Sequence, residues 1–131
     1  MIEGVGRWVV REGSNVRRVA SALELQAALD EINEHARKRL SLGTITSPQG
    51  ARLLIGIGGP QSVLQFNQGD DPPYLITLGD PDAEGVEKFF FEGQETEVER
   101  RHLIPADDAR RAALAFFETG SKPDGVRWEE V

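Results

Sequence analysis

Five short β-rich runs between residues 51 and 101 constrain the fold of this chain more than any other feature of its sequence. Each run is followed within a few residues by glycine, proline or aspartate, which favour tight turns. Because brief turns join neighbouring strands that run in opposite directions, this spacing predicts an antiparallel meander. The predicted strands cover residues 51–57, 62–67, 74–78, 87–92 and 95–101.

Residues 21–40 are predicted to form a helix before the meander begins. Ser21 and Glu24 have the spacing of a capping box, in which both side chains satisfy backbone N–H groups at the helix start. Apolar residues then recur every three or four positions, which places them on one helical face, and Gly43 is expected to end the helix. The apolar positions are Leu25, Leu29, Ile32, Ala36 and Leu40.

A second helix is predicted from about residue 105 to residue 119. Pro105 and the pair Asp107-Asp108 suit its first turn, whereas Gly120 suits the position after its last turn. Its apolar residues are expected to lie on the sheet. They are Ala109, Ala112, Ala113, Phe116 and Phe117.

Short strands are also predicted at the two ends of the chain, near residues 7–11 and after the turn at 124–125. The last strand carries Val126 and Trp128. A tryptophan in this place either packs the tail against the core, which is the favoured interpretation, or forms an exposed contact for a partner.

Together these elements predict an α+β fold, in which two helices pack on one face of an antiparallel β-meander of five to seven strands. The length of 131 residues suits a single domain over residues 1–131. No cysteine is present and no apolar run approaches the ~20 residues of a membrane span. Charged Glu3, Arg7 and Arg11 stand where a signal peptide needs apolar residues, so we expect a cytoplasmic protein.

Charge is distributed unevenly along the chain, whose net charge is −7. Residues 1–69 contain six acidic and eight basic residues, whereas residues 70–131 contain sixteen and seven. An acidic protein is a poor direct ligand for nucleic acid, which requires a basic patch. The charge favours a basic partner, with solubility alone as the alternative explanation.

Two loops and two histidines resemble chemical motifs only in part. Residues 56–60 look like a phosphate loop, but a strand follows where a helix is required. Residues 80–85 look like the start of a calcium loop, but Phe91 stands where a bidentate glutamate belongs. His35 and His102 have neither metal-ligand spacing nor an evident nucleophile. We therefore predict no catalytic residue, metal or cofactor.

Residues 95–99 contain glutamate at every second position. On a strand these side chains share one face, with neighbours roughly 7 Å apart. Repulsion within such a row destabilises the strand unless cations neutralise it. The candidate cations are Arg52, Arg100 and Arg101. We predict a stripe that binds a partner, the alternative being a solvated face or an edge protected by charge. The predicted partner-binding residues are Glu95, Glu97, Glu99, Asp80, Asp82, Glu84 and Glu92.

Three features of the sequence form one combined pattern. They are a glycine-rich hairpin, a phenylalanine-rich strand before an acidic hairpin, and a final helix followed by tryptophan. The segments are 54–59, 89–91, 104–105, 116–120 and 126–128. With them, residues 50–131 resemble the first-numbered family of bacterial immunity proteins of polymorphic toxin systems. The resemblance implies an α+β fold and a cytoplasmic inhibitor encoded beside a secreted toxin, often a nucleic-acid deaminase.

The leading hypothesis is a non-enzymatic immunity protein that covers the active site of a basic toxin with its acidic surface. One alternative is a small enzyme that uses clustered carboxylates or His102. Another is a homo-oligomeric structural domain, or one that binds a small molecule on the sheet face that carries Leu54, Gly56 and Gly58. The oligomeric state is left open by the sequence.

Overall fold

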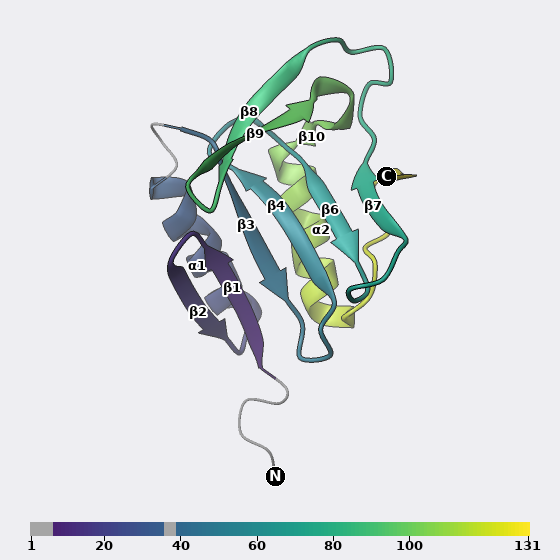
Figure 1. The fold of residues 1–131 in the computed structure, drawn as a ribbon. Helices are drawn as coiled ribbons and strands as arrows, with labels where there is room; N and C mark the ends of the chain where they lie inside the picture. The colour runs from purple at the N-terminus through teal and green to yellow at the C-terminus, as the bar shows by residue number, and fades with distance from the viewer. Residues whose placement is uncertain (1–6, 36–38) are drawn as a thin grey trace.

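Eleven strands and two α-helices make up the part of the chain that the structure describes (Figure 1). The structure is a computed structural model, which describes residues 7–35 and 39–131. The helices are α1 (Ala22–His35) and α2 (Ala106–Thr119), with a short 3₁₀ helix, η2 (Arg100–His102). The strands are β1 (Trp8–Glu12), β2 (Asn15–Val19), β3 (Ser41–Thr46), β4 (Arg52–Ile57), β5 (Gln61–Ser62), β6 (Leu64–Asn67), β7 (Tyr74–Thr77), β8 (Val86–Phe91), β9 (Gln94–Glu99), β10 (Ile104–Pro105) and β11 (Trp128–Glu130).

One large sheet contains nine of these strands. Along the path β11-β7-β6-β4-β3-β1-β2 every neighbouring pair is antiparallel. The β8–β9 hairpin joins this path through one parallel pairing, of Phe90 with Ser41 in β3. The predicted α+β fold, with an antiparallel sheet and two helices, is confirmed. The described part of the sheet has nine strands where five to seven were predicted, and β2, β3 and β10 were not predicted as strands.

Helix α1 begins at the predicted capping box. The Glu24 N–H donates to Ser21 Oγ over 3.1 Å, and Glu24 Oε1 accepts the N–H of Ala20 over 2.9 Å. The predicted end was wrong, because Leu40 lies beyond the helix and Gly43 lies inside β3. Both edges of β3 pair with other strands, β1 and β4, and this pairing outweighs the helical periodicity. Ala36, the fourth predicted apolar position, lies outside the described residues.

Helix α2 agrees closely with its prediction. Pro105 occupies the N-cap, and Asp107 and Asp108 lie in the first turn, where acidic side chains favour the helix dipole. Gly120 ends the helix in the left-handed conformation at φ 71°, and its N–H donates to the Phe116 carbonyl over 2.7 Å. Four of the five predicted apolar positions are buried, while Phe117 is partly buried.

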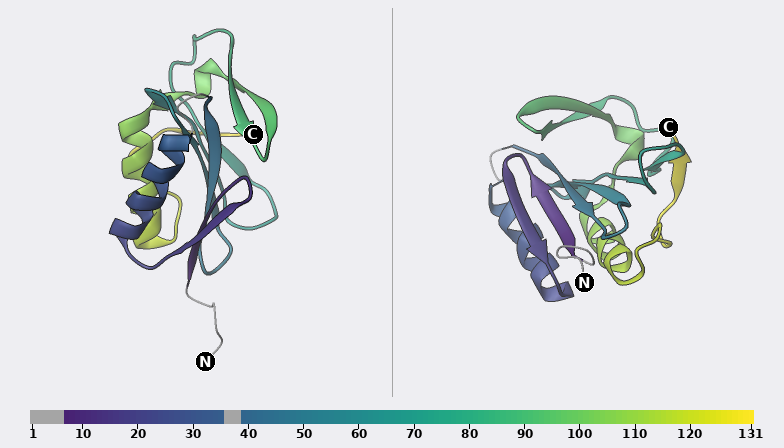
Figure 2. Two further views of the ribbon diagram at one scale, coloured as in Figure 1. Left: turned by 90° about the vertical axis from the view of Figure 1, so that its left-hand side faces the viewer. Right: turned by 60° about the horizontal axis from the view of Figure 1, so that its bottom comes forward.

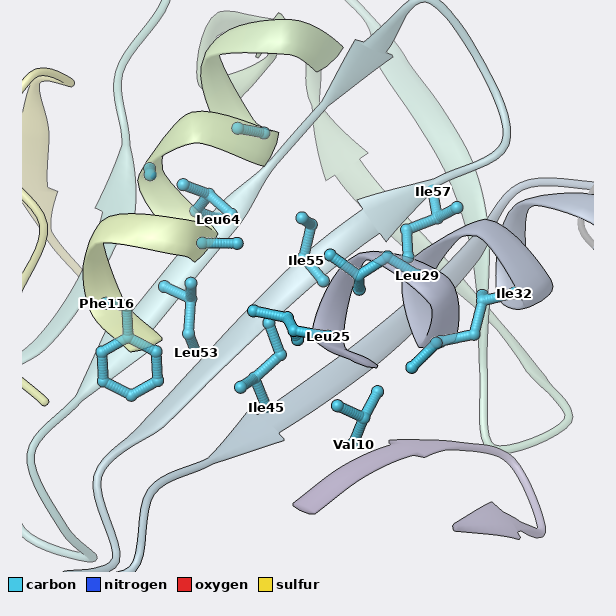
Figure 3. Packing of buried hydrophobic residues seen from close by; sticks show 14 of the residues in the cluster. Val10, Leu25, Leu29, Ile32, Ile45, Leu53, Ile55, Ile57, Leu64 and Phe116 are labelled. Atoms are coloured by element: carbon cyan, nitrogen blue, oxygen red, sulfur yellow. The ribbon is translucent and has the colours of Figure 1, made fainter. Parts of the chain in front are cut away.

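The main core lies between the two helices and one face of the sheet (Figure 3). In β4, Leu53 and Ile55 point into this core, as does Ile57 at the end of the strand. Their alternation is the predicted one, because successive side chains of a strand point to opposite faces. From the helices, Leu25 and Phe116 pack against them and are fully buried.

Both tryptophans pack at the margin of the main core. The Trp8 ring lies edge-on to Phe116, with 5.0 Å between ring centroids. Trp128 packs beside Phe66, and its Nε1–H donates to the Pro123 carbonyl over 2.9 Å. These contacts support the favoured interpretation of Trp128, in which it packs the C-terminal strand against the core.

The β8–β9 hairpin lies over the face of the sheet opposite the helices (Figure 2). A second, smaller core lies between the hairpin and this face. Phe89 and Val98 of the hairpin pack there on Leu42 and Val63. Gly56 makes the approach possible, since a Cβ at this position would lie 2.7 Å from Phe89 Cε2. An aromatic ring therefore lies against the sheet face that carries Gly56.

Candidate partner-binding surface

The acidic stripe, Glu95, Glu97 and Glu99, projects from the outer face of β9. All three glutamates are exposed, while Val98 between them is buried and Thr96 is half-buried against the sheet. Strand alternation therefore places the carboxylates as the sequence predicted. Because the inward side chains pack beneath them, the stripe lies on a supported surface rather than on a free loop.

Cationic side chains neutralise the charge of the acidic stripe only in part. Lys88 Nζ lies 3.4 Å from Glu95 Oε1, and Arg101 Nε lies 3.3 Å from Glu99 Oε2. Glu97 stands opposite Lys88 in the strand register but forms no ion pair with any residue that the structure describes. These pairs are exposed, so each contributes little to stability. The stripe therefore keeps negative charge available to a partner.

The other two predicted cations have different partners. Arg100 of η2 pairs with Glu87 of β8, with 3.7 Å between Nη2 and Oε2. Arg52 pairs with Asp70 over 2.7 Å, on the open face of the main sheet. Of the three arginines considered, Arg101 alone contacts the stripe. Fewer cations neutralise the acidic stripe than the sequence alone suggested.

The remaining predicted acidic residues lie around the two ends of the hairpin. Asp80, Asp82 and Glu84 are exposed in the loop before β8. Asp80 Oδ1 accepts the N–H of Asp82 over 3.0 Å, so this carboxylate also shapes its own turn. Within residues 7–35 and 39–131, no group of three or more acidic or histidine side chains is arranged to hold a metal ion.

Glu92 occupies the tip of the hairpin in an unusual backbone conformation. Its φ is 51°, and the next residue, Gly93, has φ 81°. Two successive positive φ angles are typical of the tight turn that joins twisted strands, where asparagine and glycine are preferred. Glutamate is less suited to this conformation than asparagine.

A cluster of charged side chains joins the end of β9 to β11. Arg101 Nη1 donates to Glu129 Oε2 over 2.9 Å, and this hydrogen bond is the main cause that raises the pKa of Arg101. His102 is buried beside them, with 3.8 Å from Nδ1 to Glu99 Oε2 and from Nε2 to Glu129 Oε1. Both distances exceed those of a hydrogen bond. Neither carboxylate therefore accepts a hydrogen bond from His102.

A groove that the sequence analysis missed lies between the hairpin and the open face of the sheet. Its volume is about 570 Å³. Phe91, Glu92 and Thr96 border it on the hairpin side. The alternation of Thr44, Ile45 and Thr46 is the sequence signal that could have revealed its floor. One row of that floor, aligned across four strands, is Arg11, Thr44, Leu54 and Gln65.

The structure thus combines an α+β fold with an exposed row of glutamates on a packed hairpin. Residues 13–130 match the family model described as Immunity protein Imm1. The chain therefore belongs to the Imm1 family of immunity proteins, which are components of polymorphic toxin systems. This match confirms the family resemblance. A search of curated proteins found no match, and no described helix is both long and apolar enough to cross a membrane.

Proposed function

We propose that this immunity protein acts in the cytoplasm and neutralises a cognate secreted toxin by covering its active site with the acidic stripe. The observation that carries the proposal is the row of three exposed glutamates on a packed hairpin, with Glu97 unpaired among the described residues. The toxin is expected to be basic and to act on nucleic acid, with the deaminase class as the candidate. The chain itself is expected to act by binding, not by catalysis.

Electrostatic attraction explains how such a surface selects its partner. An enzyme that acts on nucleic acid needs a cationic groove for phosphates. A row of carboxylates roughly 7 Å apart can occupy that groove in place of the substrate. Opposite charge also accelerates encounter, which favours inhibition before the toxin meets its target.

Packing beneath the stripe explains how it can bind tightly. Phe89 and Val98 hold the hairpin against the sheet, so little conformational freedom is lost when a partner binds. Exposed ion pairs are individually weak, while protection by an inhibitor requires nanomolar affinity, about −12 kcal/mol. Apolar contacts at the rim of the stripe must therefore contribute much of the affinity.

Removing the charge of the acidic stripe tests the proposal. The variant E95Q/E97Q/E99Q should bind an inactive form of the toxin module encoded beside this chain at least about tenfold more weakly. The salt dependence of its dissociation constant should also be smaller. Calorimetry at two salt concentrations measures both quantities, and thermal unfolding verifies the fold.

A matched control variant distinguishes the effect of losing the acidic stripe from the effect of a less negative net charge. Glu118, Asp124 and Glu130 are exposed acidic residues outside the hairpin. The variant E118Q/D124N/E130Q loses the same three charges and should retain most of the affinity. Equal affinities for the two variants would contradict the proposed site, and no binding of the toxin module by the unmodified chain would contradict the proposed function.

A further inference from the structure

The groove on the open face differs in charge from the rest of this acidic protein. Cross-strand pairing places Arg18 and Arg52 in one row, and Arg11 in the adjacent row. Among the outward positions of β2, β1, β3, β4 and β6, these three are arginine and none is aspartate or glutamate. In a chain with 22 acidic and 15 basic residues, these strands form a cationic floor. Arg11 and Arg52 line the groove itself together with Glu92 of the hairpin tip, whereas Arg18 lies beyond the lining on the same face.

The floor of the groove also offers uncharged hydrogen-bonding groups. Thr44, Thr46 and Gln65 are half-buried and line the groove. Their side chains form no hydrogen bond with any residue in the described part of the chain. They can therefore bond to a ligand without losing a partner within the protein.

Arg52 shows how a carboxylate can bind at this floor. Its Nη2 lies 2.7 Å from Asp70 Oδ1, and the Asp70 side chain is 93% exposed. A pair this exposed is weak, so a carboxylate from a partner can replace that of Asp70. Arg11 is exposed at the other end of the groove and has no ion pair among the described residues.

The spacing of the arginines indicates an extended ligand. From strand separations of about 4.8 Å, the Cα atoms of Arg18 and Arg52 lie roughly 14 Å apart across the sheet. An extended segment of about four to five residues spans this distance. A single small carboxylate spans only part of it.

We propose that the groove receives an extended segment of the partner toxin that carries carboxylates, and that the toxin is thereby held by two faces of opposite charge. This inference rests on the proposed function, because it assigns a second contact to the same partner. The acidic stripe contacts basic residues of the toxin, while Arg11, Arg18 and Arg52 contact acidic ones.

A protein segment suits the groove better than a nucleic acid. A polyanion that approached this face would be repelled by the net charge of −7 and by the acidic hairpin beside the groove. A protein segment brings few negative charges and also presents backbone groups to the threonine and glutamine side chains.

Removing the three arginine charges of the open face should change the affinity for the toxin in the direction opposite to that expected from net charge alone. The variant R11Q/R18Q/R52Q makes the chain more acidic, which by long-range attraction alone would strengthen binding to a basic toxin. We expect instead that its affinity for the inactive toxin module falls at least about tenfold. The single variant R11Q, at an exposed position, should show the same direction if the triple variant unfolds.

A control variant removes three cations elsewhere. Lys122 is exposed, and Arg17 and Arg111 form exposed pairs with Glu31 and Asp108. The variant R17Q/R111Q/K122Q should bind the toxin module as tightly as the unmodified chain or slightly more tightly. A groove variant that behaves like this control would overturn the inference.

The outcomes distinguish the inference from the function on which it rests. Weak binding by the stripe variant with normal binding by the groove variant overturns the groove alone. The reverse result overturns the stripe and supports the groove. Binding of a ten-nucleotide single-stranded DNA by the unmodified chain, lost in R11Q/R18Q/R52Q, would overturn the choice of a protein segment.

Discussion

The helix-covered face of the sheet and the face that carries the hairpin are built from the same strands, yet they are covered to different extents. Two helices cover the first face along with an extensive core that includes Leu53 and Phe116. The hairpin covers one end of the second face through a small core around Phe89. The rest of the second face stays open as the groove.

Under the proposed function, this difference separates the residues that stabilise the fold from those that contact a partner. Residues of the first face are apolar because they pack on helices, and a partner cannot reach them. The second face leaves charged and polar side chains on a rigid sheet, which is a favourable support for a contact surface. Variants that alter one face at a time can therefore separate folding from binding.

The largest expected effect comes from opening a cavity on the helix-covered face. Phe116→Ala should lower the free energy of unfolding by about 3–5 kcal/mol, since the ring is fully buried. Urea unfolding followed by circular dichroism measures this loss. An unchanged unfolding midpoint would show that the main core does not dominate stability.

A smaller effect is expected where the hairpin meets the sheet. Gly56→Ala should cost about 1–3 kcal/mol, because the added Cβ lies 2.7 Å from Phe89 Cε2. It should also weaken binding of the toxin module, since the displaced hairpin carries the acidic stripe. Chemical unfolding and calorimetry measure the two effects.

Gly43 provides the matched control for that substitution. It lies in the neighbouring strand β3, and a Cβ there would lie 3.4 Å from Ile32 Cδ1, near the short end of van der Waals contact. Gly43→Ala should change stability by less than about 1 kcal/mol and leave binding unchanged. If both variants bind normally, the position of the hairpin does not determine recognition.

The smallest expected effect lies at the hairpin tip. Glu92→Asn should raise the free energy of unfolding by up to about 1 kcal/mol, because asparagine tolerates the positive φ of 51° better than glutamate. The same variant should bind the toxin module more weakly if the Glu92 carboxylate contacts it. A decrease in melting temperature would contradict the backbone argument, and unchanged affinity would remove Glu92 from the proposed surface.

Local signals in the sequence were sufficient for several elements. The capping box of Ser21 and Glu24 marks the start of α1, and Pro105 with Gly120 marks both ends of α2. Alternating glutamates place the acidic stripe on one face of β9. Each of these features depends on residues a few positions apart, so periodicity and capping chemistry specify it.

Other elements depend on contacts between distant residues and were missed. Residues 41–46 directly follow the predicted helix and were not predicted as a strand, yet they form the strand that pairs with both β1 and β4. The groove was missed for the same reason, because its floor exists only after these strands are aligned. The pairing of Phe90 with Ser41, which holds the hairpin over the sheet, also joins distant segments.

The sequence by itself determined the α+β class, the extent of α2, the alternation along the glutamate strand and the unequal charge of its two halves. Tertiary structure alone decided that the hairpin lies across the face opposite the helices, and that Arg11 and Arg52 line a groove there, with Arg18 on the same face. The physical reason is the range of the interactions. Backbone propensity and capping act over a few residues, whereas sheet register and the fit of Phe89 over Gly56 require segments that meet only in the folded chain.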